Sequence, residues 1–219
     1  MEDHDTAQEN RDLKFFGRVM ASVSHEIKNV LAVINEKAGL LKDLSLMDAK
    51  GHPLDPRRVH DLAEDLKYQI RRGDLIIGNM NRFSHSVDHD IQEIDSAEVA
   101  RLIIALSERG ASQLCVKINL VNCDSSVTLK TRTFGLEFLM WDCLRFAMLT
   151  CGKDGSVNIS LDKTENTVKV RYLLKHGRRP DPLPVFPEDS CRMLMQELGA
   201  ELSIDDKTGN MVISIKDIC

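Results

Sequence analysis

Apolar side chains recur along residues 16–41 at the three- and four-residue spacing of an amphipathic helix. They are Phe16, Met20, Val23, Ile27, Val30, Ile34, Ala38 and Leu41. At about 100° per residue, this stripe leaves His25 on the opposite side of the helix. The pattern predicts one long helix from near Asn10 to about Leu46, preceded by a flexible lead-in over residues 1–10.

A second amphipathic pattern follows a polar segment that contains Gly51, Pro53 and Pro56. Glycine and proline end helices, so this segment predicts a turn. The apolar positions beyond it are Val59, Leu62, Ala63, Leu66, Ile70, Ile77, Met80 and Phe83. Two long helices joined by a short turn form an antiparallel hairpin. One hairpin cannot bury two full apolar stripes, whereas two hairpins can form a four-helix bundle, so we expect a homodimer.

From Asp95 onward, helical and strand patterns alternate. Helices are predicted over residues 95–109, 134–150 and 188–198. Strands are predicted over residues 114–121, 127–130, 156–162, 167–174, 200–204 and 211–216. We expect an α/β sandwich in which helices cover one side of an antiparallel sheet. The predicted fold class is therefore α+β, with the hairpin over residues 11–92 and the sandwich over residues 93–219.

Composition and charge narrow the classes of function. A net charge of −5 argues against nucleic-acid binding, and short basic runs such as Arg71-Arg72 are interpreted as solvated. No apolar run approaches the roughly 18 residues of a membrane span, and the acidic N-terminus is unlike a secretion signal. We expect a cytoplasmic protein with no membrane partner.

The cysteine pattern indicates neither a metal site nor a redox pair. No Cys-x-x-Cys occurs, and no histidine partner is placed close to a cysteine. We expect no cofactor or metal bound by this chain, and small buried cysteines with an exposed exception at Cys219. The six are Cys115, Cys123, Cys143, Cys151, Cys191 and Cys219.

The run Ser24-His25-Glu26-Ile27-Lys28-Asn29-Val30-Leu31-Ala32 strongly resembles the phospho-accepting box of bacterial sensor histidine kinases. That box is a His-Glu-x-x-Asn/Thr pattern on the first helix of a dimeric hairpin. Box, helix length, turn, second helix and following α/β domain occur in the family's order from about residue 12 to 219. One departure is Val30, where the family often has a proline that bends the helix.

The resemblance implies that His25 carries a phosphoryl group, with Glu26 as its acid/base helper. Asn29 lies one turn along on the same face, and in related kinases a polar residue there positions water for removing phosphate from the partner. An imidazole with a pKa near 6.5 is mostly neutral at cytosolic pH and can attack phosphorus. The residues around His25 lack a large hydrophobe and suit docking of another protein: Arg18, Ala21, Ser22, Lys28 and Ala32. The alternative is a surface histidine on a coiled-coil hairpin.

The resemblance also implies a nucleotide site in residues 95–219, and its motifs are missing. Phe146 occupies the family's main metal-ligating Asn position, and a phenyl ring cannot ligate magnesium. Residues 175–180 replace the expected Asp-x-Gly-x-Gly turn, and residues 180–187 replace the flexible lid with a proline-rich segment. No Gly-x-Gly, which could bring backbone N–H groups close to phosphates, occurs in the chain. We expect no ATP binding.

This combination looks like the kinase-derived histidine phosphotransferases of multistep phosphorelays. We expect His25 to take a phosphoryl group from the aspartyl phosphate of one response-regulator receiver domain and to pass it to another receiver. The receiver would supply the magnesium. The alternatives are a non-catalytic regulator or phosphatase-type partner of a receiver or kinase, and residual ATP use through an unfamiliar site.

Overall fold

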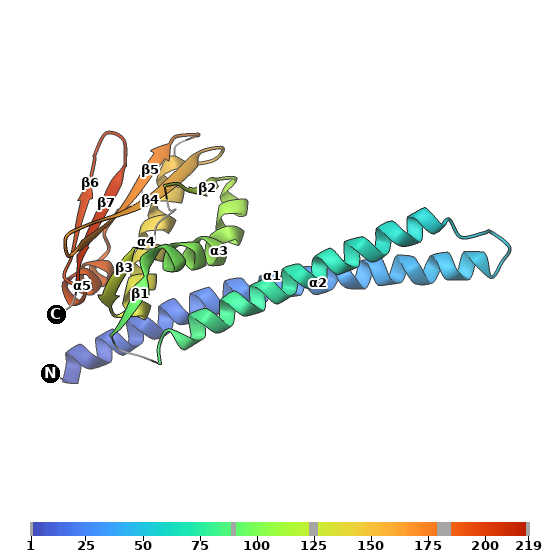
Figure 1. Ribbon diagram of the computed structural model, residues 1–219, viewed down its shortest axis with the longest axis horizontal. Coiled ribbons are helices and arrows are strands. Elements are labelled where there is room, and N and C mark those ends of the chain that lie inside the picture. The colour runs from blue at the N-terminus through green and yellow to red at the C-terminus, as the bar shows by residue number, and fades with distance from the viewer. Residues whose placement is uncertain (1, 89–90, 123–126, 179–184, 218–219) are drawn as a thin grey trace. The chain divides into compact units, whose positions relative to one another are not determined.

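The computed structural model describes residues 2–88, 91–122, 127–178 and 185–217. The helices are α1 (Glu2–Asp48), α2 (Pro56–His85), α3 (Ser96–Leu114), α4 (Thr133–Cys151) and α5 (Asp189–Glu197). The strands are β1 (Gln92–Asp95), β2 (Lys117–Leu120), β3 (Thr128–Thr131), β4 (Ser156–Thr164), β5 (Thr167–Lys175), β6 (Ala200–Ile204) and β7 (Met211–Lys216) (Figure 1). Two compact units result: a hairpin unit of residues 16–82, and an α/β unit of residues 1–15 and 83–219.

The hairpin unit is an antiparallel pair of long helices joined by a short turn, as predicted. Asp55 precedes α2 and its Oδ1 accepts a 2.9 Å hydrogen bond from the backbone N–H of Arg57, which caps the helix. Farther along, Lys37 of α1 donates to Asp65 of α2 at 2.7 Å. This ion pair links the two helices at that level of the hairpin.

Both helices are longer than their sequences predict. α1 begins at Glu2, not near Asn10, and it continues without interruption through Val30. α2 continues through Gly73 and Gly78, although each glycine weakens a helix by about 1 kcal/mol relative to alanine. A Cβ added at Gly73 would stand 3.4 Å from Val30 Cγ1, so this part of α2 packs directly against α1. Packing between the helices offsets the low helix propensity.

The buried stripe of α1 differs from the predicted one. Two predicted positions, Val23 and Val30, are buried, and so is Val19, which was not predicted. The other predicted positions are less covered: Phe16, Met20, Ile27, Ile34 and Leu41 are half-buried and Ala38 is exposed. On α2, Leu62 is buried, but the predicted Ile70 and Ile77 remain 52% and 42% exposed. The physical reason is that each helix carries an apolar stripe wider than one partner helix can cover.

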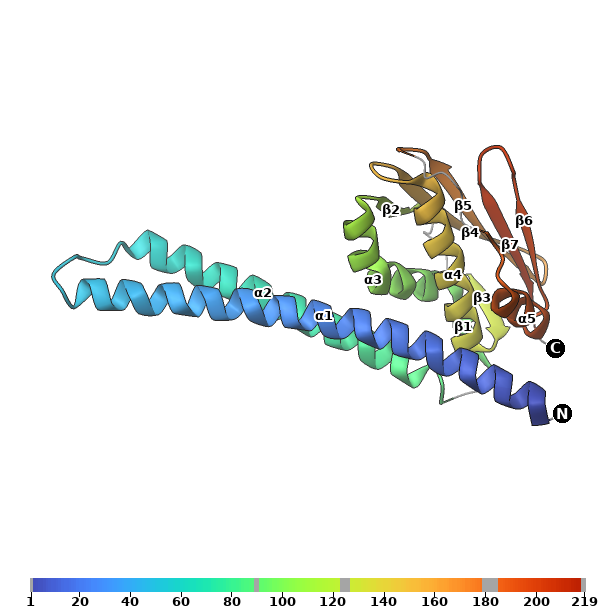
Figure 2. The ribbon, with the colours of Figure 1, turned by 180° about the vertical axis from the view of Figure 1, so that it is seen from behind.

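The α/β unit contains a five-stranded sheet with the order β2-β4-β5-β7-β6 and a separate two-stranded sheet of β1 and β3. Along β4, β5 and β7 every second residue is buried, and α4 and α5 pack on this sheet (Figure 2). The sandwich is therefore confirmed, with two corrections. β2 pairs with β4 in parallel, and the two-stranded sheet includes β1, a strand that the sequence did not predict.

The first turns of α1 belong to the α/β unit. Arg11 donates from both terminal nitrogens to the two carboxylate oxygens of Glu197, at 2.9 and 3.0 Å. Phe15 is fully buried and stacks on Phe138 with ring centroids 4.2 Å apart, and its ring also lies 5.5 Å from that of Trp141. Arg11 and Phe15, which the sequence assigned to the hairpin over residues 11–92, therefore contribute to the α/β unit.

The cysteine prediction is correct for some residues and wrong for another. Cys143, Cys151 and Cys191 are buried, and burial raises the pKa of the Cys151 thiol to about 11, so it stays protonated. Cys115 is exposed, because it ends α3 in the left-handed conformation with φ 52°. Cys123 and Cys219 lie outside the described residues. Among the helices of the described chain, none is long and apolar enough to cross a membrane.

Candidate functional site

His25 lies in the middle of α1 with its side chain exposed. Because α1 is a regular helix, residues three, four and seven positions away share the side of the helix that carries His25. These positions hold all the predicted docking residues and Asn29. Arg18, Ala21, Lys28, Asn29 and Ala32 are exposed, and Ser22 is half-buried. The structure therefore brings His25, Asn29 and the predicted docking residues together on one accessible face of the hairpin unit.

The Glu26 side chain lies toward α2, away from the exposed face that carries His25. Its position is one residue, or about 100° of helix rotation, from His25, and only 14% of its side chain is exposed. Its Oε2 atom lies 3.6 Å from Nη2 of Arg72 on α2. Glu26 thus borders both the exposed face around His25 and the contact between the two helices.

Arg72 is a site residue that the sequence did not reveal. The Arg71-Arg72 pair was interpreted as solvated, which holds for the exposed Arg71 but not for the half-buried Arg72. The apolar pattern of α2 gave no such signal, because the predicted stripe positions on either side of Arg72, Ile70 and Ile77, are themselves 52% and 42% exposed. The register of the hairpin, which decides that Arg72 meets Glu26, is set by tertiary packing.

The arrangement can present a nucleophilic imidazole nitrogen to a group carried by another protein. An exposed ring, flanked by the small side chains of Ala21 and Ala32, leaves room for a partner surface to approach. A carboxylate in the adjacent position can balance positive charge that develops on the ring. Within the described residues, no group of three or more His, Cys, Asp or Glu side chains could hold a metal ion.

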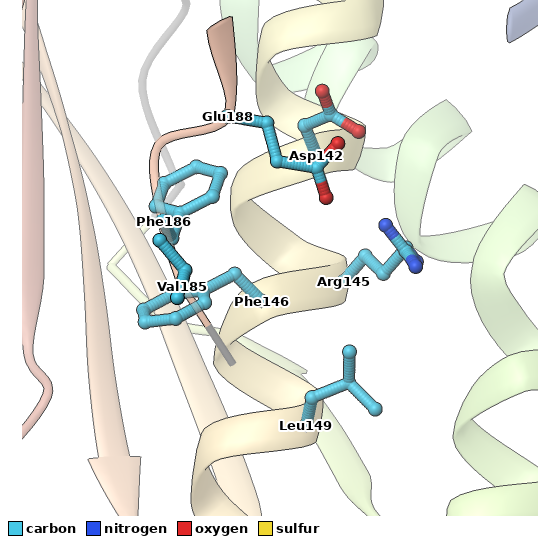
Figure 3. A pocket seen from close by; sticks show the side chains of 7 residues that line it. All are labelled: Asp142, Arg145, Phe146, Leu149, Val185, Phe186 and Glu188. Atoms are coloured by element: carbon cyan, nitrogen blue, oxygen red, sulfur yellow. The ribbon is translucent and has the colours of Figure 1, made fainter. Parts of the chain in front are cut away.

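A pocket lies in the α/β unit between α4 and the segment before α5. α4 contributes Asp142, Arg145, Phe146 and Leu149, and the segment before α5 contributes Val185, Phe186 and Glu188 (Figure 3). The Phe146 ring stacks on Phe186 with centroids 4.5 Å apart and planes 15° from parallel. The two rings lie on the side of α4 that faces the segment before α5.

The pocket is small. It offers about 50 Å³, which is room for a few water molecules, whereas small-molecule pockets usually measure about 300–1,000 Å³. Gly177 in the segment that replaces the glycine turn serves packing instead, because a Cβ there would lie 2.0 Å from the Lys153 carbonyl oxygen. The proline-rich segment was predicted to replace the lid; its residues 180–184 lie outside the described residues. Phe186, which covers Phe146, was not singled out from the sequence.

Comparison with known proteins places the fold. No protein-family model matches the chain, and no curated protein matches its sequence. A solved structure described as a bacterial phosphotransferase matches with a TM-score of 0.51 and 15% identity, over 93% of this chain and 96% of that one. The likeness is one of fold. It confirms the predicted α+β class, a helical hairpin followed by an α/β sandwich.

Solved structures of histidine kinases match with lower TM-scores. The structure of histidine kinase ThkA in complex with response regulator protein TrrA has a TM-score of 0.49 and 16% identity, over 99% of this chain and 66% of that one. Histidine kinase AdeS of Acinetobacter baumannii has a TM-score of 0.45 and 12% identity, over 88% of this chain and 97% of that one.

Proposed function

We propose that this chain is a histidine phosphotransferase of two-component signalling, which moves a phosphoryl group between aspartates of receiver domains through a phosphohistidine at His25. The observation that carries the proposal is the exposed His25 at the centre of the box on α1, in a chain whose α/β unit has an aromatic stack at the nucleotide position. The likeness in fold to a bacterial phosphotransferase is consistent with this function.

The reaction is a pair of phosphoryl transfers. A lone pair on one imidazole nitrogen of His25 attacks the phosphorus of the aspartyl phosphate. The N–P bond forms as the acyl O–P bond breaks, and the aspartate leaves as a carboxylate with the electron pair. In the second transfer, a carboxylate oxygen of the accepting aspartate attacks phosphorus, and the N–P electron pair returns to the imidazole.

The chain supplies position and charge balance for these steps. Glu26 offsets the positive charge that develops on the ring when its nitrogen bonds to phosphorus. Asn29, one turn along on the same face, would position the phosphoryl group or a water. Arg18, Ala21, Ser22, Lys28 and Ala32 form the docking face, and the receiver brings the magnesium.

The quaternary state that we propose is a homodimer through the hairpin unit. Leu31 of α1 is 57% exposed, and Ile70 and Ile77 of α2 are 52% and 42% exposed. Each large aliphatic side chain that is removed from water stabilises an assembly by about 1.5–3 kcal/mol. A second hairpin would cover these side chains and complete a four-helix bundle.

The proposal excludes ATP as the phosphoryl donor. Support comes from the Phe146–Phe186 stack and the small pocket beside it. Titration with ATP and magnesium, followed by tryptophan fluorescence and calorimetry, should show no binding. Saturable binding, or label on the chain after incubation with γ-labelled ATP, would instead support the alternative of residual ATP use through an unfamiliar site.

Phosphotransfer profiling tests the function itself. Receiver domains from the source organism are phosphorylated with labelled acetyl phosphate, freed of it, and mixed singly with the chain. Label that moves to the chain and then to a second, unlabelled receiver supports the relay. Label that disappears from a receiver as inorganic phosphate, without appearing on the chain, favours the phosphatase-type partner instead.

A further inference from the structure

The contact between Arg72 and Glu26 follows from the packing of the hairpin. Gly73, next to Arg72, lies against Val30, which is one turn beyond Glu26 on α1. This contact places Arg72 and Glu26 at the same level of the hairpin, with Nη2 and Oε2 3.6 Å apart. The guanidinium therefore lies beside the carboxylate because of the helix register.

The two side chains differ in what surrounds them. The Glu26 side chain is 14% exposed and the Arg72 side chain is 40% exposed. A charge that is largely covered is screened less by water and salt than a charge on the open surface. An arginine suits such a pair, because its guanidinium is always charged and is weakly hydrated. Lys28, on the side of α1 that carries His25, is exposed to solvent.

A phosphoryl group brings negative charge to the residue adjacent to Glu26. An unbalanced carboxylate at that distance repels the incoming group, and the repulsion is strongest where water is excluded by a docked partner. The same carboxylate is needed to stabilise the imidazole when the N–P bond forms. A cation on the far side of Glu26 lowers the net negative charge beside the incoming group, and it holds the carboxylate in place for the imidazole.

We propose that Arg72 is a positioning residue for phosphoryl transfer at His25: it holds the Glu26 carboxylate against α2 and balances its charge. Arg72 acts through Glu26 and makes no contact with the phosphoryl group. The inference rests on the proposed function, because only phosphoryl transfer brings negative charge to His25. It assigns a role to α2 in chemistry that the sequence places entirely on α1.

Single-turnover transfer from a labelled receiver tests the role of Arg72. The receiver is the one that labels the wild-type chain fastest, and its affinity for each variant is measured separately. Arg72→Gln should slow transfer about tenfold to a hundredfold, the range for a misplaced catalytic group, with receiver affinity unchanged. Arg72→Lys should restore most of the rate, because it keeps the charge. In a chain that already carries Glu26→Gln, Arg72→Gln should change the rate by less than about twofold.

Arg71→Gln is the matched control, since it removes the same charge from the exposed neighbouring position. It should transfer at the wild-type rate. The inference is overturned if Arg72→Gln matches Arg71→Gln, or if Arg72→Gln slows the Glu26→Gln chain as much as it slows the wild type, which is the result of a structural role. If no receiver labels the wild-type chain, the proposed function fails, and this inference fails with it.

Discussion

The buried ring of Phe15 gives a quantitative test of where the α/β unit begins. Phe15 is 0% exposed, and the centroid of its ring lies 4.2 to 5.5 Å from those of four other rings: Phe83, Phe134, Phe138 and Trp141. Phe15→Ala removes a whole aromatic side chain from a close-packed site. Such truncations cost about 3–5 kcal/mol, because the surrounding rings collapse only in part.

Urea unfolding followed by fluorescence measures this loss. Trp141 is the single tryptophan of the chain and lies 5.5 Å from Phe15, so its signal reports on the α/β unit. With a slope of about 2 kcal/mol per molar urea, a loss of about 4 kcal/mol lowers the unfolding midpoint by about 2 M. Truncation of the 69% exposed Leu13 is the control, and it should change the free energy by less than about 0.5 kcal/mol.

A Phe15→Ala chain that unfolds at the same midpoint as the Leu13→Ala chain would refute the reasoning. In that case the first turns of α1 would not contribute to the core of the α/β unit. A lower midpoint together with a changed slope would instead show that the substitution alters how much surface unfolding exposes.

Three further predictions concern the dimer, the docking face and pH. Ile77→Glu should convert the homodimer to a monomer in sedimentation equilibrium, since it places a charge on the exposed apolar face of α2; a dimer of unchanged affinity would place the interface elsewhere. Ala21→Trp should block label transfer while the dimer stays folded by circular dichroism, and transfer at the wild-type rate would move the docking face. The backbone N–H of Lys130 and then the Lys163 ammonium lower the pKa of Asp217. The ionised Asp217 carboxylate therefore stabilises the folded chain above the unfolded pKa of about 3.9, and this stabilisation is lost as the pH falls through the lower folded pKa. In thermal unfolding, the Asp217→Asn chain should lose less stability than the wild type as the pH is lowered.

The elements of the α/β unit could be read largely from the sequence, because their apolar residues repeat with clear periods. β6 and β7 begin and end where predicted, and α4 differs by one residue at each end. β1 was missed because its four residues, Gln92–Asp95, contain a single aliphatic side chain and no alternation. The parallel pairing of β2 with β4 depends on the crossover through β3 and α4, which a local pattern does not specify.

For the two long helices, the sequence pattern could not predict which residues are buried and which residues pair across the hairpin. The sequence identified both helices, but Phe15-Phe16 is a doublet, and periodicity alone could not decide which ring would be buried. The structure buries Phe15 and leaves Phe16 half-buried. The position of His25 on an exposed face follows from the heptad-like spacing, whereas the pairing of Glu26 with Arg72 depends on register across two helices. Contacts between residues far apart in the chain are what local pattern cannot supply.

The measurement that tests the central claim most directly is the fate of label from a phosphorylated receiver when it meets wild-type chain or His25→Gln chain. The account predicts that label appears on the wild type, that mass spectrometry places the added phosphoryl mass on the peptide containing His25, and that a second receiver removes it. His25→Gln should bind the receiver and take up no label. Label at another residue, or no label on the wild type with any receiver, would contradict the account.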